Sequence, residues 1–363
     1  MSGIYRRRQF LIYASAAFGT SLLLKACANS STSTSNNAGE TPAPQEQESA
    51  PQAKQNFKVA IALPGIITDK AWNQAGYEGV KAIEKNLGVE TAYVENVAQA
   101  DQVEVLSDFA RRGYNLIFAH GGQFDDAIRQ VSPQFFPDTY FVGVNGTIKE
   151  KNRASLRIDH LQTSYICGII GATMTKSNKL AYLAAQSFQA TDEELRGFQL
   201  GAQSVKPDIK ITSSYTGDWN DAAKAKEATL ALISTGVDVI YQWLDNASPA
   251  VLQTAAEKGV YTFGNTTDQF DIAPKSVLTS AVKRIDLGIA YLADLAIKGN
   301  LKGEIYRIGL ENPKILYLGK FGAMVPKDVQ QKAMQAEKAI LTKKIIFENC
   351  QENGKFTRCL KKA

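Results

Sequence analysis

The fold is decided by the segment Phe57-Lys-Val-Ala-Ile-Ala-Leu63 and by the residues that follow it. Its β-branched and apolar residues predict a buried strand, which ends at Pro64-Gly65. Residues 70–85 then show helical periodicity, and residues 91–94 form a second short strand. A strand, a helix and a strand in this order predict a βαβ unit with two parallel strands.

The same alternation continues in two runs, which are separated by a break before residue 161. Two such runs predict two parallel-sheet α/β domains, each with helices on both faces of its sheet. Ligands of such sheets bind outside the carboxyl ends of the strands, so the loops after the strands are the candidate site. The other expected strands are 115–119, 140–144, 180–184, 209–215, 237–242, 260–263 and 277–279, and the expected helices are 101–112, 124–131, 161–174, 192–205, 222–234, 248–258, 284–298 and 327–340.

The composition is that of a globular protein. Of the 363 residues, 44% are hydrophobic and 21% are charged, which excludes a disordered chain and a membrane-embedded one. The net charge is +5 without a basic stripe, so we expect no nucleic-acid partner. The two histidines lack metal-ligand spacing, and the chain carries no nucleophile-elbow, phosphate-loop or dinucleotide motif. We therefore expect no metal, no cofactor and no enzymatic activity.

Residues 1–27 have the features of an export signal. A basic head that includes Arg7 and Arg8 precedes an apolar run that is too short for a transmembrane span. The arginine pair resembles the twin-arginine export pattern. The segment Leu24-Lys-Ala-Cys27 resembles a lipobox, in which Cys27 would be acylated, although Lys25 departs from that motif. An uncleaved N-terminal anchor is the alternative, and both place the folded chain on the outer (periplasmic) face of the cytoplasmic membrane.

Two other segments have a distinctive composition. Residues 28–56 are rich in Ser, Thr, Ala, Pro, Gln and Glu, which predicts a flexible linker. Near the other end, Cys350 and Cys359 flank Asn353-Gly354, a hairpin turn signal. In an oxidising compartment such a pair can form a disulfide, and two unrelated thiols near a frayed terminus are the alternative. Cys167 lies in an apolar helical pattern that is typical of a buried free thiol.

The tryptophans give the first candidate site. All 3 tryptophans, Trp72, Trp219 and Trp243, follow expected strands. Polar residues accompany them, which suits a flat ligand that is sandwiched by aromatic rings and held at its edge by carboxylates and amides. The alternative is that each tryptophan caps a helix–strand junction of the core. The polar companions that we select as ligand-binding candidates are Asp69, Asn73 and Asp245.

Further candidates lie in other loops of the same kind. The loop after the third strand contains two glycines, Phe124 and the acids Asp125 and Asp126, either of which could instead cap the helix that begins there. Asp268 follows a later strand, and it too could either contact a ligand or cap a helix. Lys283 is either a donor to a ligand oxygen or a solvated surface lysine.

The segment Asp69-Lys-Ala-Trp-Asn-Gln-Ala-Gly-Tyr-Glu-Gly79 resembles the Asp-x-Ser-Phe-Asn-Gln…Gly signature of the basic membrane protein family of lipoproteins. The likeness extends from about residue 57 to about residue 320 and includes Gly217-Asp-Trp-Asn-Asp221. Members of this family are substrate-binding components of ABC transporters. The resemblance implies an α/β, periplasmic-binding-protein-like fold of type I, with two doubly wound parallel-sheet lobes joined by a hinge. The implied lobes are 57–158 with 284–320, and 159–283 with 321–363.

The resemblance also implies roles for individual residues. Better-known members bind purine nucleosides or purine bases, with the base stacked between aromatic rings. Matched position by position, Trp72 and Trp219 each replace a phenylalanine of the family pattern. Asp126 matches the acid that contacts the base, and Lys283 matches the lysine that reaches the sugar.

Two departures from the family pattern bear on the ligand. Thr266 stands where nucleoside receptors tend to carry an Asp, and Trp243–Ser248 replaces a Gly-rich stretch. Both departures favour a bare heterocycle over a ligand that carries a sugar. They do not decide between a purine base and a nucleoside, so both stay open. We therefore expect a monomeric substrate-binding lipoprotein of an ABC importer, which closes on a purine-like solute and docks on a permease. A receptor for another solute such as a sugar, and an envelope-tethered sensor or structural lipoprotein, are the alternatives.

Overall fold

The computed structural model describes residues 56–69, 71–131, 136–352 and 355–361. Several expectations lie outside these residues: the export signal 1–27 with Cys27, the linker 28–56 except for Asn56, and the turn at Asn353-Gly354. No helix in the described ranges is long and apolar enough to cross a membrane.

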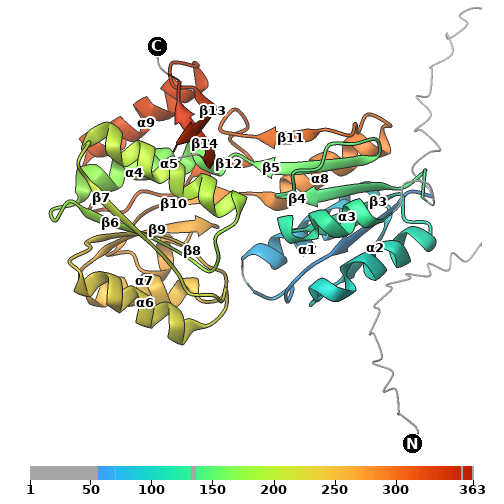
Figure 1. Cartoon of the computed structure of the whole chain (residues 1–363), viewed down its shortest axis with the longest axis horizontal. Coiled ribbons are helices and arrows are strands. Elements are labelled where there is room, and N and C mark those ends of the chain that lie inside the picture. Colours follow the sequence, from blue (N-terminus) through green and yellow to red (C-terminus); the bar gives the residue numbers. More distant parts are fainter. Residues whose placement is uncertain (1–55, 70, 132–135, 353–354, 362–363) are drawn as a thin grey trace, which may run out of the picture.

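The described residues form two α/β lobes that lie side by side along the long axis of the molecule (Figure 1). The first lobe has a six-stranded sheet with the order β11-β5-β4-β3-β1-β2, in which every neighbouring pair is parallel. Helices α1 and α8 pack on one face of the sheet, and α2 and α3 pack on the other. These elements are β1 (Lys58–Ala62), α1 (Trp72–Leu87), β2 (Glu90–Val94), α2 (Gln102–Arg111), β3 (Leu116–His120), α3 (Asp125–Gln130), β4 (Tyr140–Val144), β5 (Arg153–Ile158), α8 (Ile285–Ile297) and β11 (Ile305–Ile308).

The second lobe repeats this arrangement. Its six-stranded sheet has the order β12-β10-β9-β8-β6-β7, and all neighbours except β10 and β12 are parallel. Helices α4, α5 and α9 cover one face, and α6 and α7 cover the other. These elements are α4 (His160–Met174), β6 (Lys179–Ala184), α5 (Gln189–Val205), β7 (Lys210–Tyr215), α6 (Ala222–Ser234), β8 (Val239–Trp243), α7 (Ser248–Glu257), β9 (Tyr261–Thr266), β10 (Val277–Lys283), β12 (Leu316–Leu318) and α9 (Lys327–Leu341).

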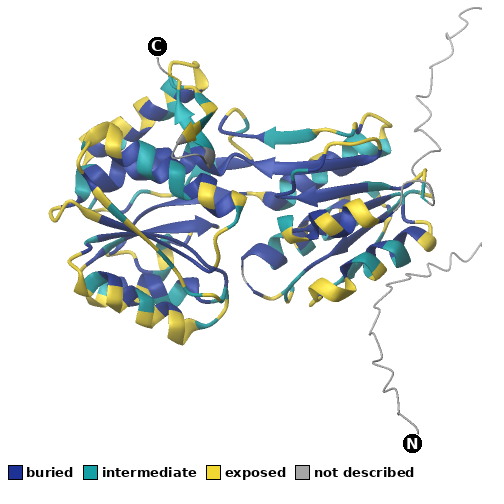
Figure 2. Ribbon diagram, in the orientation of Figure 1, coloured by how far each residue is buried: buried dark blue, intermediate teal, exposed yellow. Residues whose placement is uncertain are grey.

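The central strands are buried along their whole length. All five residues of β3 and of β8 are buried, and Figure 2 shows the central strands of both sheets in dark blue, with yellow on the outer faces of the helices. Helices cover both sides of each sheet, so these strands are continuous apolar runs without an alternating pattern. The predicted architecture of two doubly wound parallel-sheet α/β lobes is confirmed.

The chain passes between the lobes after β5, after β10 and after β11. One predicted boundary is wrong by a few residues. The expected first lobe extends to residue 320, but β12 pairs antiparallel with β10 in the second sheet, with Lys283 opposite Leu316. The last crossing is therefore complete before Leu316.

One helix start also differs from its prediction. Helix α5 begins at Gln189, three residues before the expected start at Asp192. The side chain of Thr191 lies inside the first turn, where its Oγ1 accepts a hydrogen bond from the backbone N–H of Phe188 at 3.0 Å. This bond caps the helix from within its first turn.

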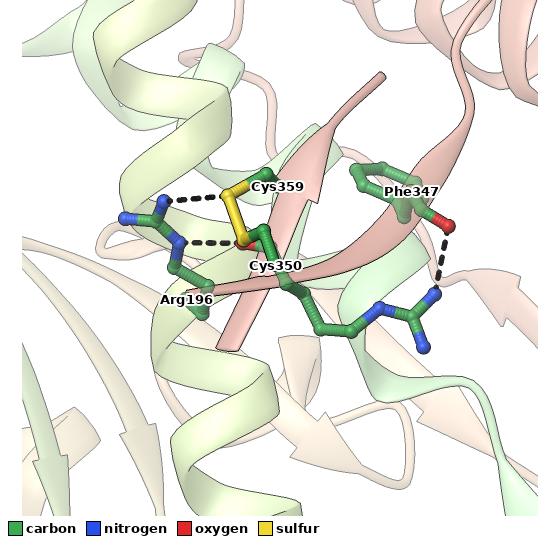
Figure 3. The surroundings of a disulfide bond; sticks show 5 residues. Arg196, Phe347, Cys350 and Cys359 are labelled. Carbon is green, nitrogen blue, oxygen red and sulfur yellow. Dashed lines mark hydrogen bonds between the residues drawn. A yellow bond between two sulfur atoms is a disulfide. The ribbon is translucent and has the colours of Figure 1, made fainter. Parts of the chain in front are cut away.

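The C-terminal strands β13 (Phe347–Glu352) and β14 (Lys355–Leu360) form an antiparallel hairpin on the second lobe. A disulfide joins Cys350 and Cys359 across this hairpin. Figure 3 shows Arg196 of α5 beside the disulfide. The Arg196 Nε donates a hydrogen bond to the Arg358 carbonyl at 2.7 Å. Cys167 is the free, buried cysteine of the described chain.

Candidate functional site

A cavity of about 610 Å³ lies between the lobes, at the carboxyl ends of both sheets. This volume falls in the range that binds small molecules, which is about 300–1,000 Å³. Its walls come from the loops after β1, β2, β3 and β4 in the first lobe and after β6, β7 and β8 in the second. Parallel strands bring their carboxyl ends to one edge, so loops distant in sequence converge there.

Aromatic side chains form much of the cavity wall. Trp72 comes from the start of α1, and Phe188, Trp219 and Trp243 come from the second lobe. The rings of Trp219 and Trp243 have centroids 6.5 Å apart and meet edge to face, as do those of Phe188 and Trp219 at 6.0 Å. The structure thus brings the three predicted tryptophans into one cavity, from both of its sides.

His120 supports the ring of Trp72 from behind. The two rings are stacked with centroids 4.2 Å apart, and His120 Nε2 donates to the Trp72 carbonyl at 2.8 Å. Burial lowers the pKa of His120 to about 4, with the Trp72 carbonyl opposing that shift, so the imidazole is neutral at pH 7. His120 therefore positions Trp72 without adding charge, a role that the sequence did not reveal.

Asp69 orders the loop that carries Trp72 and Asn73. Its carboxylate accepts hydrogen bonds from three backbone N–H groups, of Ala71, Asn73 and Gln74, and from the Asn73 side chain at 2.7 Å. Asp69 is buried and does not line the cavity, so its predicted ligand contact is corrected to helix capping. Asn73 does line the cavity, and its Oδ1 accepts from the Gly65 N–H at 3.0 Å.

The acid that faces the cavity after β3 is Asp125. Its Oδ2 accepts from the backbone N–H of Thr147 at 2.8 Å and from the Thr147 hydroxyl at 2.7 Å. Its Oδ1 is buried and has no hydrogen-bond partner among the described residues. A Cβ on Gly146 would lie 2.6 Å from this oxygen, so the glycine leaves room for the carboxylate.

Two predictions in this loop are corrected. Asp126, which was expected to contact a ligand, is exposed and pairs with Arg129 at 2.9 Å, because successive residues at a helix start point in different directions. Phe124 is fully buried in the core beneath the loop and does not line the cavity.

Asp245 is the corresponding acid of the second lobe. It lines the cavity, is 7% exposed, and its Oδ1 has no hydrogen-bond partner within the described part of the chain. Burial raises its pKa well above the ordinary value, the charge of Asp69 adds to that shift, and the Trp72 backbone N–H opposes it. Its own N–H donates to the Trp219 carbonyl at 3.0 Å, which ties its loop to the loop after β7.

Lys283 does not reach the cavity. Its side chain is fully buried, and its Nζ donates to Glu194 Oε2 and to Asn265 Oδ1, each at 2.7 Å. The Nζ also lies 3.8 Å from the centroid of the Trp243 ring. Both expected roles of Lys283, ligand donor and surface lysine, are therefore corrected, because an internal carboxylate holds the ammonium.

The predicted contact of Asp268 is corrected as well. Asp268 is exposed, and its carboxylate accepts from the Ser280 hydroxyl at 2.9 Å and from the Lys320 N–H at 3.0 Å. The next residue, Gln269, is buried and accepts from Gln242 at 3.0 Å. The loop after β9 thus closes on its own lobe and contributes nothing to the cavity wall.

Sequence reasoning missed several polar residues of the wall. Gln99 and Gln102 follow β2, Asn145 follows β4, and Gln186 and Gln189 flank the start of α5. Their position after strands was a usable signal, but glutamines are common in exposed loops and did not stand out. Among the described residues, no group of three or more His, Cys, Asp and Glu side chains lies close enough together to hold a metal ion.

Comparisons with known proteins bear on this site. The model of a family described as PnrA-like ABC transporter substrate-binding proteins matches residues 56–351. The chain is 31% identical to the transcriptional activator protein Med of Bacillus subtilis over 76% of this chain and 86% of that protein. It is 30% identical to a purine-binding protein of Brucella abortus over 80% of this chain and 83% of that protein. The crystal structure of an ABC transporter solute-binding protein from Aeropyrum pernix K1 has a TM-score of 0.72 at 19% identity, covering 82% of this chain and 94% of that one, which shows the shared fold.

Proposed function

The chain belongs to the family of PnrA-like ABC transporter substrate-binding proteins, and from this premise we propose that it captures a purine-like heterocycle between its lobes. The observation that carries the proposal is the pair Asp125 and Asp245. Both residues line the cavity, and each has a buried carboxylate oxygen without a hydrogen-bond partner among the described residues. A buried acceptor without a partner is costly, and a ligand N–H group would satisfy it.

The aromatic rings suit the flat faces of the same ligand. Trp72 lies on the first-lobe side, and Trp219 and Trp243 lie on the second-lobe side, so a planar ring between the lobes meets indole surfaces from both directions. Stacking of a nucleobase on an aromatic ring contributes about 1–3 kcal/mol. Purines combine a large flat face with N–H groups at the edge, which is the combination that this cavity complements.

Capture requires movement of one lobe relative to the other. Near the crossings, the guanidinium of Arg157 in β5 lies 2.9 Å from the carboxylate of Glu193 in α5. His160 Nε2 lies 3.2 Å from Asn145 Oδ1. We propose that these contacts stay closed as a hinge while the walls beside Asp245 and Trp72 separate and close on the solute. The closed chain then docks on the permease of an ABC importer.

The N-terminal residues supply the location in this proposal. Export directed by Arg7 and Arg8 and acylation at Cys27 tether the chain to the outer face of the cytoplasmic membrane. The segment 28–56 gives the lobes reach toward a permease in the same membrane. In this account the chain acts as a monomer and has no catalytic role.

Intrinsic fluorescence tests the proposal, because all 3 tryptophans of the chain line the cavity. The full-length protein is titrated with adenine, guanine and hypoxanthine, and separately with D-ribose, D-xylose and amino acids. We expect a saturable change with a purine base and none with the sugars. A change with a sugar alone would make the protein a sugar receptor, and no change with any solute would favour the sensor or structural alternative.

A further inference from the structure

The positive charge of the folded chain gathers near its C-terminus. Residues 327–363 contain nine Lys and Arg and four Asp and Glu, a net charge of +5, whereas residues 57–326 contain slightly more Asp and Glu than Lys and Arg. The described part of this segment forms α9 and the hairpin of β13 and β14, on the side of the second lobe away from α6 and α7 (Figure 1). The excess of cations is therefore confined to one part of one lobe.

The lysines of this region have no acidic partners. Six of them are exposed and form no ion pair with a described residue: Lys327, Lys332, Lys338, Lys343, Lys344 and Lys361. The backbone brings the last three of these close together. Helix α9 ends at Leu341, and the backbone N–H of Lys361 donates to the Ile346 carbonyl at 2.8 Å, so the end of the hairpin lies beside the residues that follow the helix.

Large apolar side chains are exposed among these lysines. Met334 is 53% exposed, more than any other large apolar residue of the described chain, and Leu341 and Ile346 are 46% and 40% exposed. Met334, Lys338 and Leu341 share one face of α9, because residues three and four apart are neighbours on a helix. The helix dipole favours lysines after the last turn of α9, but it does not account for apolar side chains exposed beside them.

This mixture fits the surface of an anionic lipid bilayer. Ammonium groups on long stems contact the phosphates of the headgroups, while apolar side chains enter the boundary between headgroups and acyl chains. An acidic protein would match the charge alone. The core of a protein interface is depleted of lysine, whereas here Lys338 lies between the two exposed apolar residues of the helix face.

We propose that this surface contacts the membrane by binding the headgroups of anionic phospholipids. We call it the α9 face, and it consists of Met334, Lys338, Leu341, Lys343, Lys344, Ile346 and Lys361. The inference rests on the proposed location of the chain and goes beyond its proposed function. None of these residues lines the cavity, so membrane contact and solute capture use different surfaces. Contact with the bilayer limits the orientations of the tethered lobes, which raises their effective concentration at a permease in the same membrane.

Acetylation of individual lysines, measured by mass spectrometry, tests the proposal in the full-length protein. Vesicles of phosphatidylglycerol with phosphatidylcholine are compared with vesicles of phosphatidylcholine alone. Residues 1–27 carry a basic head and an apolar run that also bind lipid, so the measurement must be made at each lysine separately. We expect acetylation of Lys338, Lys343 and Lys344 to fall by about fivefold or more with the anionic vesicles alone. Acetylation of Lys224 and Lys226 on α6 should change by less than about twofold.

Two variants of equal net charge provide the matched control. The first combines Lys338→Gln, Lys343→Gln and Lys344→Gln, and the second combines Lys224→Gln, Lys226→Gln and Lys258→Gln, which are exposed residues of α6 and the end of α7. Protection of Lys361 by anionic vesicles should be lost in the first variant and retained in the second. Purine affinity should stay within about twofold in both, because none of the altered residues lines the cavity.

The outcomes separate this inference from the proposed function. Equal acetylation with both kinds of vesicle, or protection of Lys361 that survives in the first variant, overturns the inference. Protection by cell membranes with their proteins, but not by protein-free anionic vesicles, assigns the α9 face to an acidic protein and overturns it as well. Failure of the unaltered protein to bind any purine bears on the proposed function alone, because the acetylation of these lysines is measured without solute.

Discussion

The two lobes share one scaffold and present different surfaces to the cavity. Both sheets have the same strand order, and the loops after β3 and β8, which are equivalent strands, each place a carboxylate in the cavity, Asp125 and Asp245. The first lobe adds a single indole, Trp72, whereas the second adds Trp219, Trp243 and Phe188. The fold therefore determines where a ligand binds, and the loop residues of each lobe determine which ligand binds there.

The lobes also differ after their fourth strands. The loop after β4 enters the cavity through Asn145 and Thr147, and Thr147 holds Asp125 in place. The equivalent loop after β9 turns inward, where Asn265 binds Lys283. The first lobe thus uses its polar groups at the cavity, and the second lobe buries some of its polar groups behind an aromatic wall.

The largest expected effect concerns the carboxylate of the first lobe. Asp125→Ala should weaken purine binding by about a hundredfold, because the N–H of the ligand loses a charged acceptor worth about 1.5–3 kcal/mol. The neighbouring Asp126→Ala is the control and should change affinity by less than about twofold, since an exposed ion pair contributes little. Isothermal titration of both variants measures this, and equal losses would contradict the assignment of Asp125.

Loss of the aromatic ring of each lobe should have a smaller and unequal effect. Trp72 is held by stacking on His120, while Trp219 is half-buried, so Trp72 is the better preorganised platform. Trp72→Ala should weaken binding by about tenfold to a hundredfold, and Trp219→Ala should weaken it less. Isothermal titration of both variants measures the two losses of affinity. A larger loss in Trp219→Ala would show that the second lobe provides the main stacking surface.

The carboxylate of the second lobe should make stability depend on pH. Because the pKa of Asp245 is raised on folding, the folded chain binds more protons, and stability falls as pH rises from the ordinary value of 3.8 toward the raised pKa. Asp245→Asn should therefore stabilise the ligand-free protein at pH 7 by about 1–3 kcal/mol. The gain should shrink toward pH 4 in thermal unfolding at a series of pH values. An equal gain at both pH values would contradict a pKa of Asp245 that is raised on folding.

The smallest expected effect on binding comes from the hairpin, which lies outside the cavity wall. Cys350→Ser with Cys359→Ser removes the disulfide and should lower the free energy of unfolding by about 2–3 kcal/mol. Purine affinity should stay within about twofold, since none of the described hairpin residues lines the cavity. A large loss of affinity would mean that the hairpin controls closure of the second lobe.

Much of the fold could be predicted because its elements have strong local signals. The runs at β1, β3 and β8 are mostly apolar, and helices α1 and α2 are clearly amphipathic. The errors arose where tertiary contacts decide, as at β12, where pairing with β10 assigns a short strand to the second sheet.

The site could be predicted by region and only partly by residue. Position after a strand was sufficient to find Trp72, Asn73, Trp219, Trp243 and Asp245. Whether Asp125 or Asp126 faces the cavity depends on the residue at which the helix begins, because successive side chains of a helix point in different directions. A sequence pattern does not define that start to within one residue. The burial of Lys283 depends on its ion pair with Glu194, which lies 89 residues away in the chain. No sequence pattern around Lys283 indicates this partner.

Thermal unfolding of the full-length protein tests the central claim, a cleft for a purine-like solute, most directly. Melting temperatures are compared with adenine, guanine, hypoxanthine, their ribonucleosides, sugars and amino acids. A ligand at a hundred times its dissociation constant stabilises by about 2.7 kcal/mol, which raises the melting temperature by a few degrees. The account predicts this shift for at least one purine base or its ribonucleoside, and not for a sugar or an amino acid. A shift produced only by another class of solute, or by none of them, would contradict it.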